Sequence, residues 1–108
     1  MRVRVCHRDE VAPGTMRAFA IDGLSIPVLV ANLGDRFVAS SGICPHEDVD
    51  LADGDIEGSV VSCPGHGYHF DLITGRCTHD PTLCLRRFAV ILDGDDLIID
   101  IDLLSGPS

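Results

Sequence analysis

Two short stretches decide how this chain is read: Ile43-Cys44-Pro45-His46 and Ser62-Cys63-Pro64-Gly65-His66. They form a C-x-H pair and a C-x-x-H pair, with sixteen residues between His46 and Cys63. Each pair follows a short apolar run that is typical of a strand. The proline after each cysteine fixes φ and makes the chain turn there. The sequence therefore predicts two loops, each presenting one thiol and one imidazole.

Thiolate and imidazole are the side chains that bind iron and zinc, and two such pairs supply the four ligands of a complete site. Either pair alone would be a weak signal, but the repetition strengthens it. A disulfide framework is a poorer explanation of the cysteines, because the chain has five of them and no export signal. The sequence indicates a metal centre.

The rest of the chain predicts an all-β fold, because short apolar stretches alternate with Gly, Pro and Asp turn signals and no helical period is evident. The turns are expected at Asp22-Gly23, Gly34-Asp35, Thr74-Gly75 and Asp93-Gly94. Residues 41–58 are rich in Asp and Gly, which favours a functional loop. The expected strands are Arg2–Cys6, Thr15–Ile21, Ile26–Asn32, Phe37–Ser40, Ser59–Cys63, His69–Leu72, Leu85–Leu92 and Leu97–Ile101.

Size and charge exclude several classes of protein. A chain of 108 residues has room for one hydrophobic core, so we expect a single domain over residues 1–108. A net charge of −9 repels nucleic acid and anionic membrane surfaces. The apolar run Ile26–Ala31 is far shorter than the roughly 20 residues of a membrane helix. With no apolar signal segment at the start, we expect a cytoplasmic protein.

The paired motifs resemble those of the Rieske iron–sulfur proteins, in which two cysteines bind one iron and two histidines bind the other. The stretch from His66 to Gly75 resembles the family's segment after the second ligand pair, and Pro81 falls where the family has a third loop. The resemblance implies one [2Fe–2S] cluster on Cys44, His46, Cys63 and His66. It also implies three antiparallel sheets with two cluster loops at one tip, the cluster-binding subdomain covering about residues 42–75.

The function implied by this resemblance is one-electron transfer without catalysis, since 108 residues leave no room for a separate oxygenase iron site. Stand-alone carriers of this size resemble the ferredoxins of aromatic-ring-hydroxylating dioxygenase systems. The implied partners are a flavin-dependent ferredoxin reductase and a terminal oxygenase, which a monomeric shuttle would visit in turn.

The chain departs from the respiratory branch of the family, whose loops are braced by a disulfide. Val49 and Gly65 occupy the positions of those two cysteines, so no such bridge can form. Tyr68 and Phe70 stand where that branch has a serine and a tyrosine, and phenylalanine cannot donate a hydrogen bond. Fewer donors to the cluster predict a reduction potential toward the bottom of the Rieske span of about −150 to +300 mV.

Two alternatives stay open from the sequence. One is the small Rieske-like subunit of a nitrite reductase, and the other is a zinc-binding interaction module, although C-x-H is tighter than the usual spacing of zinc ligands. The remaining thiols, Cys6, Cys77 and Cys84, are expected to be small core or half-buried residues. His7, His69 and His79 are expected on the surface or in strands.

One acidic run follows the first ligand pair and contains no Lys or Arg. It could guide a basic partner toward the cluster, or it could serve solubility alone. Its members are Glu47, Asp48, Asp50, Asp53, Asp55 and Glu57.

Overall fold

The computed structural model describes residues 2–45, 48–65 and 67–104, and nearly all regular structure in them is β-strand. No helix in these ranges is long and apolar enough to cross a membrane. The elements are β1 (Arg2–His7), the 3-10 turn η1 (Arg8–Glu10), β2 (Met16–Phe19), β3 (Val28–Asn32), β4 (Phe37–Ser41), the 3-10 turn η2 (Leu51–Asp53), β5 (Asp55–Glu57), β6 (Val60–Ser62), β7 (His69–Asp71), β8 (Arg87–Asp93) and β9 (Asp96–Leu104).

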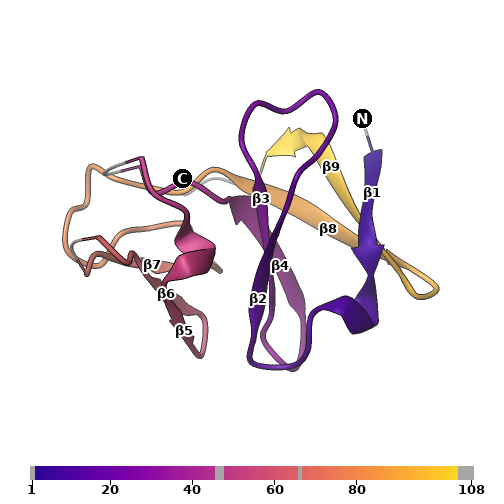
Figure 1. The fold of residues 1–108 in the computed structure, drawn as a ribbon, viewed down its shortest axis with the longest axis horizontal. Helices are drawn as coiled ribbons and strands as arrows, with labels where there is room; N and C mark the ends of the chain where they lie inside the picture. The colour runs from indigo at the N-terminus through magenta and orange to yellow at the C-terminus, as the bar shows by residue number, and fades with distance from the viewer. Residues whose placement is uncertain (1, 46–47, 66, 105–108) are drawn as a thin grey trace.

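The strands form a six-stranded sheet in the order β1-β9-β8-β4-β3-β2 and a three-stranded sheet in the order β5-β6-β7. All neighbours pair antiparallel. Figure 1 shows the small sheet at one end of the molecule and the curled large sheet at the other. The predicted all-β, antiparallel architecture is confirmed.

The number of sheets differs from the three expected, for a local reason. β1-β9-β8 and β4-β3-β2 are two three-stranded ladders, and β4 and β8 pair only through Ala39 with Phe88 and Ser40 with Arg87. Those two residue pairs join the ladders into one continuous sheet. A junction made by only two residue pairs leaves no signal in the sequence.

The predicted strands are all present, with ends shifted by a few residues. Sequence reasoning missed β5, in which Asp55 and Glu57 are exposed and Ile56 points inward. Acidic residues are depleted in strands, so a three-residue strand with two of them looks like loop. The segment expected to be loop also contains Leu51, which is fully buried in the core.

Strand β3 connects the two halves of the molecule, because all five of its residues are buried. Successive side chains of a strand point to opposite faces. Val28 and Val30 pack into the core of the large sheet, whereas Leu29 and Ala31 pack into the core around the small sheet. The small sheet therefore packs against the face of β3 that carries Leu29 and Ala31.

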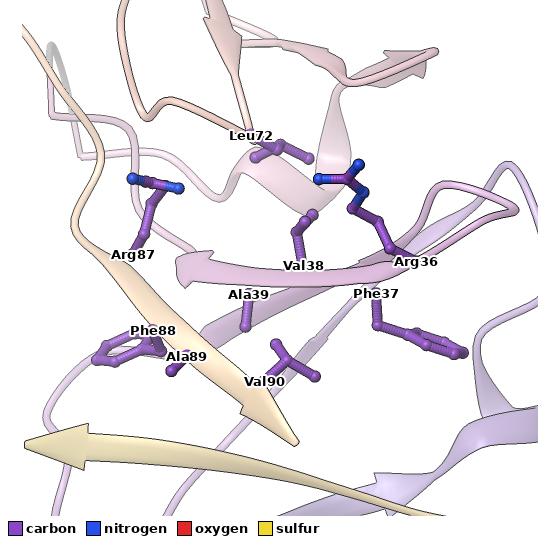
Figure 2. A pocket seen from close by; sticks show the side chains of 9 residues that line it. All are labelled: Arg36, Phe37, Val38, Ala39, Leu72, Arg87, Phe88, Ala89 and Val90. Carbon is purple, nitrogen blue, oxygen red and sulfur yellow. The ribbon is translucent and has the colours of Figure 1, made fainter. Parts of the chain in front are cut away.

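A second junction lies where the chain leaves the small sheet. Figure 2 shows Val38 of β4 pointing toward Leu72, while Phe37 and Ala39 point to the other side of the sheet. Arg36 and Arg87 lie on the same side as Leu72 and line a cavity of about 200 Å³. The Nη1 atom of Arg87 donates a hydrogen bond to the carbonyl of Ile73, which ties β8 to the segment after β7.

Candidate metal centre

The first predicted ligand, Cys44, lies three residues after the end of β4, in a loop that is closed by backbone hydrogen bonds. The amide of Cys44 donates to the carbonyl of Val49 at 3.0 Å, and the amide of Leu51 donates to the carbonyl of Gly42 at 2.9 Å. The Cys44 side chain is 2% exposed, while the next residue, Pro45, is exposed. The thiol is thus directed inward from a loop whose tip reaches solvent.

The second predicted ligand, Cys63, follows β6 directly and begins a tight connection to β7. Its amide donates to the carbonyl of Tyr68 at 2.7 Å, and the amide of Gly67 donates to the carbonyl of Cys63 at 3.1 Å. Gly67 has φ +70°, a conformation that glycine adopts without steric cost. Cys63 is 2% exposed, and Pro64 and Gly65 are exposed. The two loops therefore share one design: a buried thiol followed by an exposed turn.

The two loops are held in place by glycines with no room for a side chain. A Cβ on Gly54, at the end of η2, would lie 1.8 Å from the carbonyl oxygen of Ser62, the residue before Cys63. A Cβ on Gly42 would lie 3.0 Å from the carbonyl oxygen of Pro27. These close approaches constrain the backbone two residues before Cys44 and immediately before Cys63.

Both cysteines belong to one apolar core. Phe70 and Leu72 contribute to it from the end of the small sheet, and Leu51 contributes from η2. No disulfide involves either thiol. Thiols are the donors that iron–sulfur clusters require, and a dry core keeps competing water away from them. The two buried thiols therefore fit an iron–sulfur cluster, whereas the predicted ligands His46 and His66 lie outside the described residues.

A third segment, residues 77–84, closes over the same core. The amide of Cys77 donates to the carbonyl of Leu83 at 3.2 Å, and the amide of Thr78 donates to the carbonyl of His69 at 2.8 Å. Cys77 is buried beside the two predicted ligands, and Leu83 packs against them. A loop is thus present at Pro81, where the family resemblance predicts one.

A family model described as "Rieske [2Fe-2S] domain" matches residues 1–89. The chain belongs to the Rieske [2Fe–2S] family. This membership confirms the prediction of a Rieske [2Fe–2S] cluster and rules out the zinc-binding alternative. The assignment of the individual ligands stays a prediction.

The relatives that this chain matches along nearly their whole length include ferredoxins. The chain is 37% identical over 100 residues to the ferredoxin component of biphenyl 2,3-dioxygenase from Rhodococcus jostii strain RHA1, covering 92% of each chain. The ferredoxin of carbazole 1,9a-dioxygenase from Nocardioides aromaticivorans IC177 has 32% identity and a TM-score of 0.82, covering 100% of this chain and 99% of that one.

The ferredoxin in a complex of reduced oxygenase and oxidised ferredoxin of carbazole 1,9a-dioxygenase gives a TM-score of 0.83 at 28% identity. That match covers 99% of this chain and 95% of the other. Such relatives are electron-transfer components and not the catalytic subunits of their systems. The prediction of a Rieske electron carrier that is not itself an enzyme is confirmed.

The other cysteines divide into two groups. Cys6 and Cys77 are buried as predicted, but Cys84 is exposed, so that part of the prediction is wrong. Leu83 and Leu85 on either side of Cys84 point inward, which turns the thiol outward. Burial raises the pKa of the Cys6 thiol, and the nearby Glu10 carboxylate raises it further. Cys6 therefore stays a neutral thiol in the core of the large sheet, which is unsuited to metal binding.

The histidines outside the motifs are at the surface or in strands, as predicted. His7 ends β1, where its Nδ1 accepts a hydrogen bond from the amide of Asp9 at 3.1 Å. His69 lies in β7, and His79 is exposed on the third segment. Sequence reasoning missed that His69 and His79 meet, because they are ten positions apart and irregular chain follows β7.

Proposed function

We propose that Cys44, His46, Cys63 and His66 hold the cluster, with the cysteines on the inner iron and the histidines on the outer iron. The observation that supports this proposal is that Cys44 and Cys63 are placed in the same way. Each is a buried, unbridged thiol at the base of a backbone-closed loop, and both belong to one core. When bound, the cluster stores and releases one electron.

The chain's own residues insulate one side of this site and leave the other open. Leu51, Phe70 and Leu72 exclude water around the thiols. Among the described residues at the loop tips, Pro45, Pro64, Gly65 and Gly67 are exposed and uncharged, and Asp48 of the first loop is exposed and acidic. The small residues let a partner's redox group approach closely. We therefore place the electron port at these loop tips.

We further propose that the carrier takes electrons from a flavin-dependent ferredoxin reductase and gives them to an aromatic-ring-hydroxylating oxygenase. The oxygenase half is supported by the biphenyl and carbazole dioxygenase relatives. A cytoplasmic monomer suits a shuttle that must leave one partner before it meets the next. Residues 42–75 would be a cluster-binding insertion in a single domain, because β5, β6 and β7 all come between β4 and β8 in the chain.

Metal and sulfide analysis tests the ligand set. We expect about two iron and two acid-labile sulfide per chain, the content of a [2Fe–2S] cluster. His46→Cys or His66→Cys should lower the reduction potential sharply, since an anionic thiolate replaces a neutral imidazole. An unchanged potential with the cluster intact would remove that histidine from the ligand set.

Reconstitution tests the partners. The purified chain should restore electron flow between a ferredoxin reductase and a dioxygenase that turn over only when a carrier links them. Recovery of the chain from its host in a fixed stoichiometric complex with a nitrite reductase would contradict the shuttle role.

A further inference from the structure

The imidazoles of His69 and His79 form a close contact between two titratable side chains outside the ligand loops. Nδ1 of His69 lies 2.9 Å from Nε2 of His79. Their ring centroids are 5.0 Å apart, and the ring planes differ by 32°. At this distance one nitrogen must donate a hydrogen and the other must accept it.

This contact joins two parts of the cluster region. His69 belongs to β7, which receives the chain from the second ligand loop. His79 lies near the tip of the third segment, which supplies Cys77 to the core that contains the ligand cysteines. At its base the segment is already fixed by the backbone bond from Thr78 to His69. The imidazole contact fixes it nearer the tip.

His79 also lies against the second loop itself. Its ring centroid is 5.9 Å from that of Tyr68, tilted by 34°. The carbonyl of Tyr68 accepts the hydrogen bond from the amide of Cys63 that closes the loop. One side chain of the third segment thus contacts two consecutive residues at the end of the loop that carries Cys63.

We propose that His79 is a positioning residue that fastens the third segment over the cluster core through the hydrogen bond to His69. The proposal rests on the ligand set proposed above, because it is the loop carrying Cys63 that the segment covers. The hydrogen bond needs one ring nitrogen that donates and one that accepts.

The proposal is tested by the rate at which a chelator removes the cluster from the carrier, in its reduced or its oxidised form. His79→Phe keeps a ring but loses the hydrogen bond, so at about pH 8 it should lose the cluster about fivefold faster, the factor expected of one ordinary hydrogen bond. The double variant with His69→Phe should be no faster than the faster single variant, because the two residues share one interaction.

His79→Gln separates the hydrogen bond from packing. Its amide can donate and accept but does not titrate, so it should keep the parent's lifetime at about pH 8. His7→Phe, in the large sheet, is the matched control and should keep the parent's lifetime.

Equal lifetimes for the parent and His79→Phe would overturn the proposal, as would additive effects in the double variant. A lifetime of His79→Gln as short as that of His79→Phe would reduce His79 to a packing residue and overturn the proposal as well. A parent that binds no iron and sulfide would instead refute the proposed ligand set, so the two failures are distinguishable.

Discussion

Every strand of the six-stranded sheet spans at least four residues, whereas β5, β6 and β7 span three residues each. The core of the large sheet is mainly Val, Ile, Leu and Phe, with Cys6 as its one cysteine among the described residues. The core of the small sheet contains three cysteines, two of them proposed ligands. We expect apolar burial to stabilise the large sheet and the cluster to contribute much of the stability of the small one.

Removing a ligand cysteine should separate the two regions most clearly. We expect Cys44→Ser to lose essentially all bound iron, because a serine hydroxyl is a poor substitute for thiolate. Without the cluster, amides of β6 and β7 should lose most of their protection from hydrogen exchange, while those of β3 and β8 keep theirs. Hydrogen exchange followed residue by residue provides the measurement.

Cys84→Ser is the matched control, since this thiol is exposed and is not a proposed ligand. It should keep the cluster's visible absorption, and Cys6→Ser and Cys77→Ser are expected to keep it too. Loss of the cluster in any of these three variants would show that a ligand has been misassigned. Equal loss of protection in both sheets of Cys44→Ser would show that they unfold as one unit.

Gly54 offers the next largest effect, confined to the small sheet. Gly54→Ala places a methyl group 1.8 Å from the Ser62 carbonyl oxygen, so the strand before Cys63 must move. We expect a cost of about 3 kcal/mol or more in the free energy of unfolding, at the upper end for overpacking. The midpoint of thermal loss of cluster absorption should fall accordingly.

Gly58, in the turn between β5 and β6, is the control for Gly54. It has φ +59°, and a Cβ added there would meet nothing within 4 Å, so Gly58→Ala carries only conformational strain. That cost is about 1 kcal/mol. If Gly58→Ala destabilises the chain as much as Gly54→Ala does, the close approach to Ser62 is not what positions the second loop.

Ionisation of the Cys6 thiol should have a smaller effect on the free energy of unfolding, and this effect is specific to the large sheet. Its thiol pKa is raised by burial and by Glu10 above the ordinary value of 9.0. A raised native pKa contributes stability that is present below the unfolded pKa and is lost as pH rises through the native one. The free energy of unfolding should therefore fall above pH 9.0, by at most about 1.4 kcal/mol per pH unit for one proton.

Cys6→Val removes the titrating thiol while keeping an apolar side chain of similar size, so the alkaline slope should become shallower. Urea unfolding at several pH values measures this slope. Maleimide labelling of the native protein checks the burial directly, with Cys84 reacting and Cys6 protected. An identical slope in the parent and Cys6→Val would assign the alkaline loss to other groups.

The sequence predicted the strands well because alternation and turn glycines are local signals. Gly94, for example, has φ +63° in the turn between β8 and β9, at the predicted Asp93-Gly94 turn. What it could not predict depends on residues distant in the chain. The join between β4 and β8 rests on two residue pairs, and the contact of His69 with His79 depends on the path of an irregular loop.

The prediction for Cys84 failed for a different reason, because the sequence did contain the signal that would have placed this thiol at the surface. Cysteine is usually buried, and that average was applied to Cys84. The alternation of Leu83, Cys84 and Leu85 would have placed the two leucines inward and the thiol outward. At the metal centre the residue types predicted the ligand set proposed above, whereas the role of residues 77–84 in closing the core followed only from the fold.

The smallest expected effect on stability, and the last contrast between the two regions, lies in the surface charge. In the large sheet, acids pair with arginines: Nε of Arg4 lies 2.8 Å from Asp96, and Nε of Arg2 lies 3.8 Å from Asp100. Beside the first ligand loop, no such pair is present among the described acids, and all of them are exposed. These are Asp48, Asp50, Asp53, Asp55 and Glu57, and Glu47 of the same run lies outside the described residues.

If this acidic run guides docking, reduction of the cluster by the reductase should slow as salt rises, because charges are screened beyond about 8 Å at physiological ionic strength. Solubility alone predicts no such slope. Glu47→Gln with Asp48→Asn should weaken association and flatten the salt dependence, since rim charges act mainly on the association rate.

The paired control is Asp93→Asn with Asp95→Asn, which removes the same charge at the turn between β8 and β9. Second-order rates at several salt concentrations decide between the two roles. If both double variants match the parent in rate and slope, the acidic run serves solubility, and the docking face is formed by other residues.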